Sequence, residues 1–281
     1  MIQNFKTGLI KDIPDTRDYQ YRDVVGHAPF NWIEGYDIEE ELGFKLPVKD
    51  QGNSASCGAQ AFATYSSVLE FFASGTFEER SAKFLYSQAF LPNGGSRFAD
   101  IAQILKKQGC AREVFFPSRD KKGDPIKEEV YREASKLITP AIRNDAKSSQ
   151  ALDYYYVDTN IDLVAQAIAN NKGCLLGLIG ENNGTWYTEF PKIPKKHEWQ
   201  HGVYAGKARI INGKKFIGFF NSYGKLCGKN GWQWIGEDYF NITFAYDAVF
   251  NCITLINKEI DEKKNLLITL LLALIEKLDK K

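Results

Sequence analysis

The sequence predicts an α+β fold in which a helical N-terminal half is followed by a sheet-rich C-terminal half. Between Cys57 and Gly109 apolar residues recur at helical spacing, whereas after Ala151 short β-rich runs alternate with Gly, Asn and Lys. The 281 residues predict one domain of two lobes or two small domains, and the 44% hydrophobic content supplies enough apolar side chains for sizeable cores.

Three helices are expected in the first half. The first begins at Cys57 and ends at Gly75, because its apolar residues line one face and a glycine stands where a helix would stop. The second, in SAKFLYSQAF, is started by Ser81, and the third, in FADIAQILKKQG, ends at Gly109. Residues 119–136 carry many charges and predict a solvated connector or a surface helix.

Five short runs predict strands in the second half: YYYVD, CLLGLIG, HGVYAGKARII, KKFIGFFNS and GWQWIG. One predicted helix, IDLVAQAIANN, interrupts them. Asn212 and Gly213 stand between the third and fourth runs, and this pair is typical of the tight turn of a β-hairpin. The two runs that flank it are therefore expected to pair with each other.

The two ends of the chain differ from this body. Residues 1–46 have a mixed composition with turn residues, and we expect an extended arm there. Residues 256–281 include an apolar run with leucines at heptad spacing, which predicts an amphipathic helix. Two interpretations of this helix stay open: docking on its own domain, or self-association or assembly with a partner through residues 259–281.

Composition narrows the class of protein. The 36 Lys and Arg residues balance 35 Asp and Glu residues, so the net charge of +1 argues against a dedicated nucleic-acid surface. The N-terminus has no apolar core of signal-peptide length, and the longest apolar run, LLITLLLALI, is too short to span a bilayer. Five scattered cysteines without a C-x-x-C pair fit a reducing compartment, so a cytoplasmic protein is expected, and no cofactor is indicated.

The segment HEWQH matches a zinc-protease motif letter for letter. That chemistry needs His197 and His201 one helical turn apart, with Glu198 beside the metal-bound water. A glycine and a strand-like run follow at once, however, and the only other histidine, His27, lies far away in the N-terminal arm. We therefore expect no metal site and keep a zinc metalloprotease as a minor alternative.

Cys57 is the cysteine best placed to act as a nucleophile. It follows the turn QGNSAS and opens a predicted helix, where the helix dipole and unpaired N–H groups favour the thiolate. A lone cysteine is more often a small buried apolar residue, and that description better suits Cys174 and Cys252, which lie inside apolar runs. A nucleophilic cysteine also needs a base, a group that orients the base, and donors for an oxyanion.

Three segments supply such groups and carry a resemblance to a known family. PVKDQGNSASC, HGVYAG and FFNSYGKLCGKNGWQWI, in this order, are similar to the motifs of the papain-like cysteine proteases. Between them, FLPNGGSRFADIAQILKKQG resembles the Gly-Gly substrate-cleft loop of that family and the helix that follows it. IPDTRDYQY resembles the N-terminal segment of bacterial and bacteriophage members, so an association with a phage or prophage is one expectation.

The resemblance implies a cysteine peptidase with four catalytic residues. Cys57 would attack the carbonyl carbon of a peptide bond, while His201 would hold the thiolate as an ion pair and then protonate the leaving amine. The side-chain carbonyl of Asn221 would fix the imidazole ring. Gln51 would donate to the oxyanion together with the backbone N–H of Cys57.

Four further residues are expected to bind substrate, a peptide or a protein. Gly94 and Gly95 leave the backbone bare, so an extended substrate can pair with it like an added strand. Gln200, which precedes the base, is expected to help line a substrate pocket. Tyr223 takes the place of the Trp that in the family shields the hydrogen bond between the histidine and the asparagine.

The resemblance also implies a two-lobe papain-like fold with its cleft between the lobes. Residues 47–255 would form the peptidase domain, with a helical lobe over 47–140 and an antiparallel, β-barrel-like lobe over 141–255. The arm, 1–46, would precede this domain and the amphipathic helix, 256–281, would follow it. Because the arm is short, we expect synthesis without a classical prodomain; the arm itself can still lie in or beside the cleft and restrain activity.

The sequence departs from the family pattern at several positions. Ser54 replaces a cysteine that the family pairs with another one ahead of the Gly-Gly loop, and FLPNGG has no partner for it. Gly58 replaces the usual Trp after the nucleophile, and Ala55 replaces a usual Gly. Two further alternatives therefore stay open: an inactive or weakly active binding module, and an acyl-transfer enzyme of the transglutaminase or deamidase type.

Overall fold

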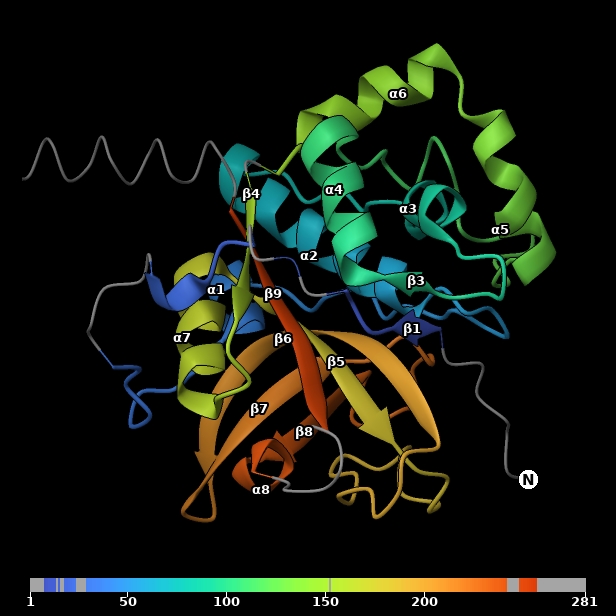
Figure 1. Cartoon of the computed structure of the whole chain (residues 1–281). Helices are drawn as coiled ribbons and strands as arrows, with labels where there is room; N and C mark the ends of the chain where they lie inside the picture. The colour runs from blue at the N-terminus through green and yellow to red at the C-terminus, as the bar shows by residue number, and fades with distance from the viewer. Residues whose placement is uncertain are drawn as a thin grey trace, which may run out of the picture.

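A computed structural model describes residues 8–13, 15, 18–23, 29–151, 153–241 and 248–256. The predicted C-terminal helix lies outside the described residues, except for its first residue, Ile256, which ends a strand. Figure 1 shows a group of helices packed on one end of a curved sheet, with α2 at the junction between them. The predicted α+β class with a helical N-terminal part is confirmed.

The helical lobe is built around α2, Cys57–Ser74, in which every residue from Cys57 to Leu69 is buried. A helix that is buried on all sides belongs to the centre of a core, not to a surface. Around it lie α3 (Ala82–Ala89), α4 (Phe98–Gln108), α5 (Glu128–Ala134) and α6 (Pro140–Ala146), with the short 3₁₀ turns η2 (Ser135–Leu137) and η3 (Lys147–Ser149).

Local sequence signals set the ends of the predicted helices. Gly75 ends α2 in the left-handed region at φ 79°, and Gly109 follows α4 at φ 79°. These values favour glycine because it has no Cβ. Ser81 caps α3, since its side chain accepts a hydrogen bond of 3.0 Å from the backbone N–H of Phe84.

The second half forms an antiparallel sheet whose strands lie in the order β4-β9-β5-β6-β7-β8. These strands are β4 (Asp153–Val157), β9 (Val249–Ile256), β5 (Cys174–Gly180), β6 (Trp199–Ile211), β7 (Lys214–Phe220) and β8 (Trp232–Gly236). A seventh strand, β2 (Tyr36–Asp37), pairs with β6, while α7 (Ile161–Asn171) packs on the sheet and α8 (Glu237–Phe240) follows β8. All five predicted runs form strands, and Asn212 and Gly213 turn between β6 and β7 at φ 50° and 77°.

The sheet is open among its described strands, so the expected barrel-like lobe is antiparallel but not a closed barrel. Closure would require β4 and β8, at the two ends of the strand order, to pair with each other. Both edges have other partners instead. Tyr156 of β4 donates its backbone N–H to the carbonyl of Tyr19 in the arm, and Trp234 of β8 donates to the carbonyl of Glu189.

Part of the N-terminal arm is a strand at the junction of the lobes. Its residues Leu9–Ile10 form β1, which pairs in parallel with β3 (Ser96–Arg97), directly after the two glycines of the predicted substrate loop. Figure 1 shows these two short strands side by side between the helices and the sheet. Further along the arm lie the 3₁₀ turn η1 (Tyr21–Asp23) and the short helix α1 (Ile38–Leu42).

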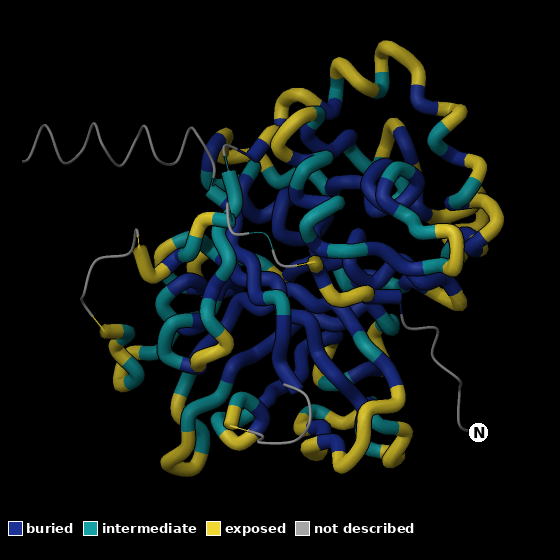
Figure 2. Tube along the Cα trace, in the orientation of Figure 1, coloured by how far each residue is buried: buried dark blue, intermediate teal, exposed yellow. Residues whose placement is uncertain are grey.

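The two lobes share one continuous buried region. Figure 2 shows the buried trace running from the helices through the junction into the sheet. One core cluster joins α2, α3 and α4 to residues of β5, β6 and β9, and a second cluster fills the space between α7 and the sheet. The start of α2 and the start of β6 therefore meet inside the protein, where burial governs the chemistry of their side chains.

Candidate active site

The start of α2 and the start of β6 touch at a pair of glycines. Gly58 follows Cys57 in the helix and Gly202 follows His201 in the strand. A Cβ on Gly202 would lie only 3.1 Å from the Cα of Gly58, so a larger residue would push the two backbones apart. Gly58, which replaces the usual Trp of the family, thus belongs to the contact between the helix start that bears Cys57 and the strand start that bears His201.

His201 is buried and has a partner on each ring nitrogen. Its Nε2 lies 3.0 Å from Oδ1 of Asn221, and its Nδ1 lies 3.1 Å from the hydroxyl of Tyr223. Strand pairing explains this arrangement, because Tyr204 of β6 pairs with Phe220 of β7. Continued past the end of β7, that register sets Tyr223 opposite His201.

Three aromatic rings surround the imidazole of His201. Tyr223 stacks on it, with 4.6 Å between the ring centroids and 14° between the planes. The indoles of Trp186 and Trp199 stand edge-on to it, with centroids at 6.1 and 6.4 Å. Trp186, in a loop that the sequence motifs did not single out, joins Tyr223 in keeping water from the imidazole.

Gln51 is fully buried and lies beside the turn that precedes the nucleophile. Its Nε2 donates to the carbonyl of Ser54 at 2.7 Å, and its Oε1 accepts from the hydroxyl of Ser222 at 2.7 Å. Its backbone N–H donates to the carbonyl of Ser222 at 2.8 Å. These bonds tie the loop before Cys57 to the residue after Asn221, so the four predicted catalytic residues lie in one region.

The N-terminal arm lies over Cys57, and its backbone is in direct contact with the backbone of the Gly-Gly loop. The backbone N–H of Ser96 donates to the carbonyl of Gly8 at 2.7 Å. A Cβ on Gly95, which has φ 77°, would lie 2.2 Å from that carbonyl oxygen, and a Cβ on Gly8 would lie 1.9 Å from the carbonyl oxygen of Ala55. Both residues must be glycine for this contact. Cys57 is fully buried beside it, with the backbone N–H of Gly8 facing its sulfur.

Burial sets the protonation states in this closed arrangement. It raises the pKa of the Cys57 thiol, even though the backbone N–H groups of Gly202, Gly8 and Gly58 face the sulfur and favour the thiolate. It also lowers the pKa of His201 to about 4, although the hydrogen bond to Asn221 opposes this shift. At neutral pH the thiol and the imidazole are therefore both uncharged while the arm is in place.

The four residues predicted to bind substrate lie at different depths around this point. Gly95 is buried under the arm, and Gly94, at φ 89°, is half-buried next to it. Gln200 is half-buried in β6, where it pairs with Ile179 of β5. Tyr223 is half-buried against His201. The arm thus occupies the position beside Gly94 and Gly95 where the sequence predicts an extended substrate.

A buried carboxylate that the sequence motifs did not reveal links the nucleophile turn to the Gly-Gly loop. Glu128 of α5 accepts from the backbone N–H of Ala55 at 2.8 Å and from the hydroxyl of Tyr86 at 2.8 Å. That hydroxyl in turn accepts from the backbone N–H of Gly95 at 3.0 Å. These hydrogen bonds connect the turn around Ser54 to the Gly-Gly loop. In the family a pair of cysteines, which this sequence lacks, connects the same two segments.

Replacing Glu128 with alanine is expected to lower peptidase kcat/KM by about tenfold, because the buried N–H of Ala55 loses its acceptor at a cost of about 1–3 kcal/mol. The measurement is steady-state kinetics, accompanied by thermal unfolding. Glu129→Ala is the matched control, since Glu129 is its exposed neighbour on the same helix. Equal losses in the two variants would contradict a role for the Glu128 link.

The segment HEWQH has no helical geometry. His197 and Glu198 lie in a loop, Glu198 pairs with Lys196 at 2.6 Å, and His201 lies inside β6. The two histidines are therefore not presented on one helical turn, as the zinc motif requires. Within the ranges that the structure describes, no three His, Cys, Asp or Glu side chains gather in a group able to hold a metal ion.

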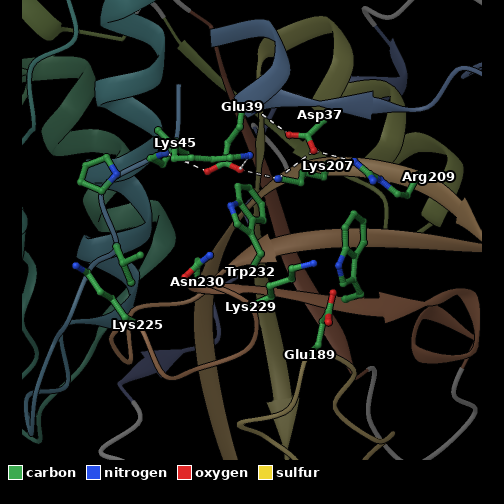
Figure 3. Close-up of a pocket in the computed structure, with 14 residues that line it drawn as sticks. Asp37, Glu39, Lys45, Glu189, Lys207, Arg209, Lys225, Lys229, Asn230 and Trp232 are labelled. Atoms are coloured by element: carbon green, nitrogen blue, oxygen red, sulfur yellow. Dashed lines mark hydrogen bonds and ion pairs between the residues drawn. The ribbon is translucent and has the colours of Figure 1, made fainter. Parts of the chain in front are cut away.

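A pocket of about 550 Å³ lies on the sheet lobe beside α1 (Figure 3). Lys207 crosses its inner wall and pairs with Asp37 at 3.0 Å and with Glu39 at 2.8 Å. Arg209 also pairs with Asp37, and Lys45 also pairs with Glu39. The positive and negative charges in this cluster compensate one another. The ion pairs hold the segment of Asp37 and Glu39, which precedes α2, against β6.

Comparisons with known proteins agree with this architecture. The chain is similar to the structure of xylellain, a cysteine protease from Xylella fastidiosa, at a TM-score of 0.71 and 21% identity over 90% of this chain and 96% of that one. It is also similar to digestive procathepsin L 3 of Tenebrio molitor (0.63, 15%, 85% of this chain and 74% of that one). Bromelain of Ananas comosus, solved with the E64 inhibitor, aligns at 0.60 and 16% over 80% of this chain and 99% of that one.

No protein-family model and no curated protein sequence matches this chain. The chain nevertheless has the fold of the papain-like cysteine proteases, as the sequence motifs predicted. Over the part of the chain that the structure describes, no helix is both long and apolar enough to cross a membrane.

Proposed function

We propose that this protein is a cysteine peptidase that cleaves peptide bonds through Cys57, with His201 as the base and Asn221 as the group that orients it. The observation that carries the proposal is the buried His201, whose Nε2 faces Asn221 while its strand touches the helix start that bears Cys57. The fold, which the chain shares with two structures named as proteases and one named as a procathepsin, supports this assignment.

The first half of the reaction forms a covalent intermediate. The Cys57 thiol passes its proton to Nδ1 of His201, and the sulfur attacks the carbonyl carbon of the substrate. A C–S bond forms, and the carbonyl π electrons move onto oxygen. Backbone N–H of Cys57 and the Gln51 amide are the proposed donors to this oxyanion. The imidazolium then protonates the amine nitrogen, the C–N bond breaks, and an acyl-enzyme thioester remains.

The second half releases the acid product. His201, now neutral, accepts a proton from a water molecule as the water oxygen attacks the thioester carbon. The C–S bond breaks, the thiolate regains its proton, and the carboxylic acid leaves. Nε2 keeps its proton throughout because it donates to Asn221, so one ring nitrogen carries all the proton transfers.

The arm must leave the cleft before a substrate can bind. It pairs with Ser96 next to the Gly-Gly loop, and it buries the sulfur that has to reach the substrate carbonyl. Leu9 of the arm is 2% exposed, and its side chain packs near Gly177 in β5. In this proposal, the conformation with the arm in the cleft is a closed state of the enzyme.

The test combines product masses with labelling of cysteines, on the chain with and without residues 1–13. Hydrolysis splits a peptide and adds one water, whereas deamidation shifts the mass by about one dalton without cleavage. We expect cleavage, together with faster alkylation of Cys57 by iodoacetamide than of Cys174. All five cysteines are buried, so Cys174 is a matched control. Deamidation without cleavage would replace the proposal with the acyl-transfer alternative, and absence of both would favour a binding module.

A further inference from the structure

Gln233 is a fully buried polar residue in the middle of β8, next to the active site. The strand pattern GWQWIG gives no reason for a glutamine at this position, since its neighbours Trp232 and Trp234 are both buried too. A buried amide is costly unless its donors and acceptors are all satisfied. The question is therefore what its hydrogen bonds do.

The Nε2 of Gln233 donates to two backbone carbonyls, that of Trp186 at 2.6 Å and that of Thr188 at 2.7 Å. A carbonyl oxygen can only accept, so the atom that faces both of them must be the nitrogen of the amide. The side-chain oxygen must then point the other way. It lies 2.6 Å from Nδ2 of Asn221 and also accepts from the thiol of Cys227 at 3.3 Å.

The direction of these hydrogen bonds also fixes the orientation of the Asn221 amide. Because its amide nitrogen donates to Gln233, its Oδ1 is the atom that faces His201. The backbone N–H of Ser222, which can only donate, lies 2.7 Å from the same Oδ1 and agrees with this orientation. Oδ1 can only accept, so Nε2 of His201 must carry the proton. Nδ1 then carries no proton: in the described conformation it accepts from the hydroxyl of Tyr223 at 3.1 Å, and the thiol of Cys57 has to take the place of that hydroxyl before Nδ1 can accept its proton.

We infer that Gln233 is a positioning residue that sets the amide orientation of Asn221 and, through it, the Nε2–H tautomer of His201. This inference rests on the proposed function, because the tautomer matters only if Nδ1 takes a proton from Cys57. Hydrogen bonds of fixed direction run from the loop carbonyls of Trp186 and Thr188 through Gln233 and Asn221 to the base, His201. They also couple that loop, which carries an indole edge-on to the imidazole, to the state of the ring.

An apolar residue at 233 would remove one end of this series of hydrogen bonds. The two loop carbonyls and Nδ2 of Asn221 would then lose their partner, while the N–H of Ser222 would still hold Oδ1. The amide of Asn221 would be held from one side only, and the Nδ1–H tautomer would become accessible. A wrong tautomer cannot accept the thiol proton, and in the serine triad it costs about 10⁴ in kcat.

Two measurements on the full chain test this inference. The first is nitrogen NMR of the wild-type protein with labelled histidine, in which His201 is assigned by its loss in His201→Gln. We expect a neutral ring with the proton on Nε2 at pH 7. A proton on Nδ1 would overturn the inference without any need for a Gln233 variant to fold.

The second measurement uses Gln233→Met, which keeps the length of the side chain and removes its hydrogen bonds. We expect kcat to fall about tenfold with KM unchanged, because Ser222 still holds Asn221. In the Asn221→Ala background the same substitution should have little further effect on kcat. Gln103→Met is the matched control, since Gln103 of α4 donates to the hydroxyl of Tyr154 in β4 and takes no part in the hydrogen bonds around His201. Equal losses in both backgrounds, or an unchanged tautomer and kcat, would overturn the inference.

A failure of the proposed function gives a different result. If the protein is no peptidase, no substrate is cleaved by any variant. We can still measure the tautomer of His201 and the rate of Cys57 alkylation, and their change in Gln233→Met. These measurements then test the positioning role of Gln233 independently of peptidase activity.

Discussion

Replacing His201 with alanine is expected to lower kcat/KM on the order of 10⁴-fold. General acid–base catalysis by a positioned side chain contributes about 10²–10⁴, and His201 acts in both halves of the proposed reaction. It also takes the proton that leaves Cys57, so its loss removes the nucleophile as well as the leaving-group acid. The measurement is hydrolysis of a peptide that the wild-type protein cleaves.

His197→Ala is the matched control for this prediction. His197 belongs to the same HEWQH segment but lies in a loop outside the strand. The peptidase proposal expects wild-type activity from this variant, whereas a zinc site on both histidines would lose activity in either variant. Comparable loss from both substitutions would therefore count against Cys57–His201 chemistry.

Removing residues 1–13 is expected to raise both peptide turnover and the alkylation rate of Cys57 by about ten- to a hundredfold. Burial of Leu9 contributes about 1.5–3 kcal/mol and each arm hydrogen bond about 1 kcal/mol, offset by the ordering of the arm. A net closing free energy of about 1.4–2.8 kcal/mol corresponds to this range of rates. The measurement compares the shortened chain with the full chain.

A point substitution tests the same contact without deletion. Gly8→Ala should behave like the shortened chain, because its Cβ would lie 1.9 Å from the carbonyl oxygen of Ala55. Ile10→Ala is the matched control, since Ile10 is on the same strand but 40% exposed. Rates for Gly8→Ala that equal those of the full chain would show that the arm does not restrain the site.

The pH dependence of closure is expected to follow Asp12 of the arm. Its carboxyl accepts from the backbone N–H of Ala99 and from the hydroxyl of Tyr156, both at 3.1 Å, and burial raises its pKa to about 6. Asp100 and Asp18 add to the rise by repulsion. Because the closed arm favours the neutral acid, the contribution of Asp12 to closure is fully present below its ordinary pKa of 3.8 and is lost as pH rises through about 6.

The ratio of alkylation rates in the full and shortened chains isolates this effect, because the titration of the thiol itself cancels. We expect the ratio to rise as pH approaches 6, and we expect Asp12→Asn to lack this rise while keeping any pH dependence that the lowered pKa of His201 adds. If the ratio has the same pH dependence in the wild type and in Asp12→Asn, the pH dependence of closure comes from another group.

Much of the fold could be predicted because local signals agreed with the final structure. Gly75, Ser81 and Gly109 set helix ends through backbone conformation and capping, which are properties of a few adjacent residues. β9 was not predicted, since it gains its identity from pairing with β4 and β5. β1 has two residues and is defined only by its partner strand. Pairing over long sequence separation leaves little trace in local composition.

The order of motifs in the sequence determined which side chains could form a site. Gln51, Cys57, His201 and Asn221 were named because their motifs resemble those of the papain-like family, and the structure gathers them in one region. Only the tertiary structure decided their state. The arm over Cys57, Glu128 under the nucleophile turn and Gln233 behind Asn221 come from distant parts of the chain. Burial and hydrogen-bond direction fix protonation and tautomer, and neither exists before the chain has packed.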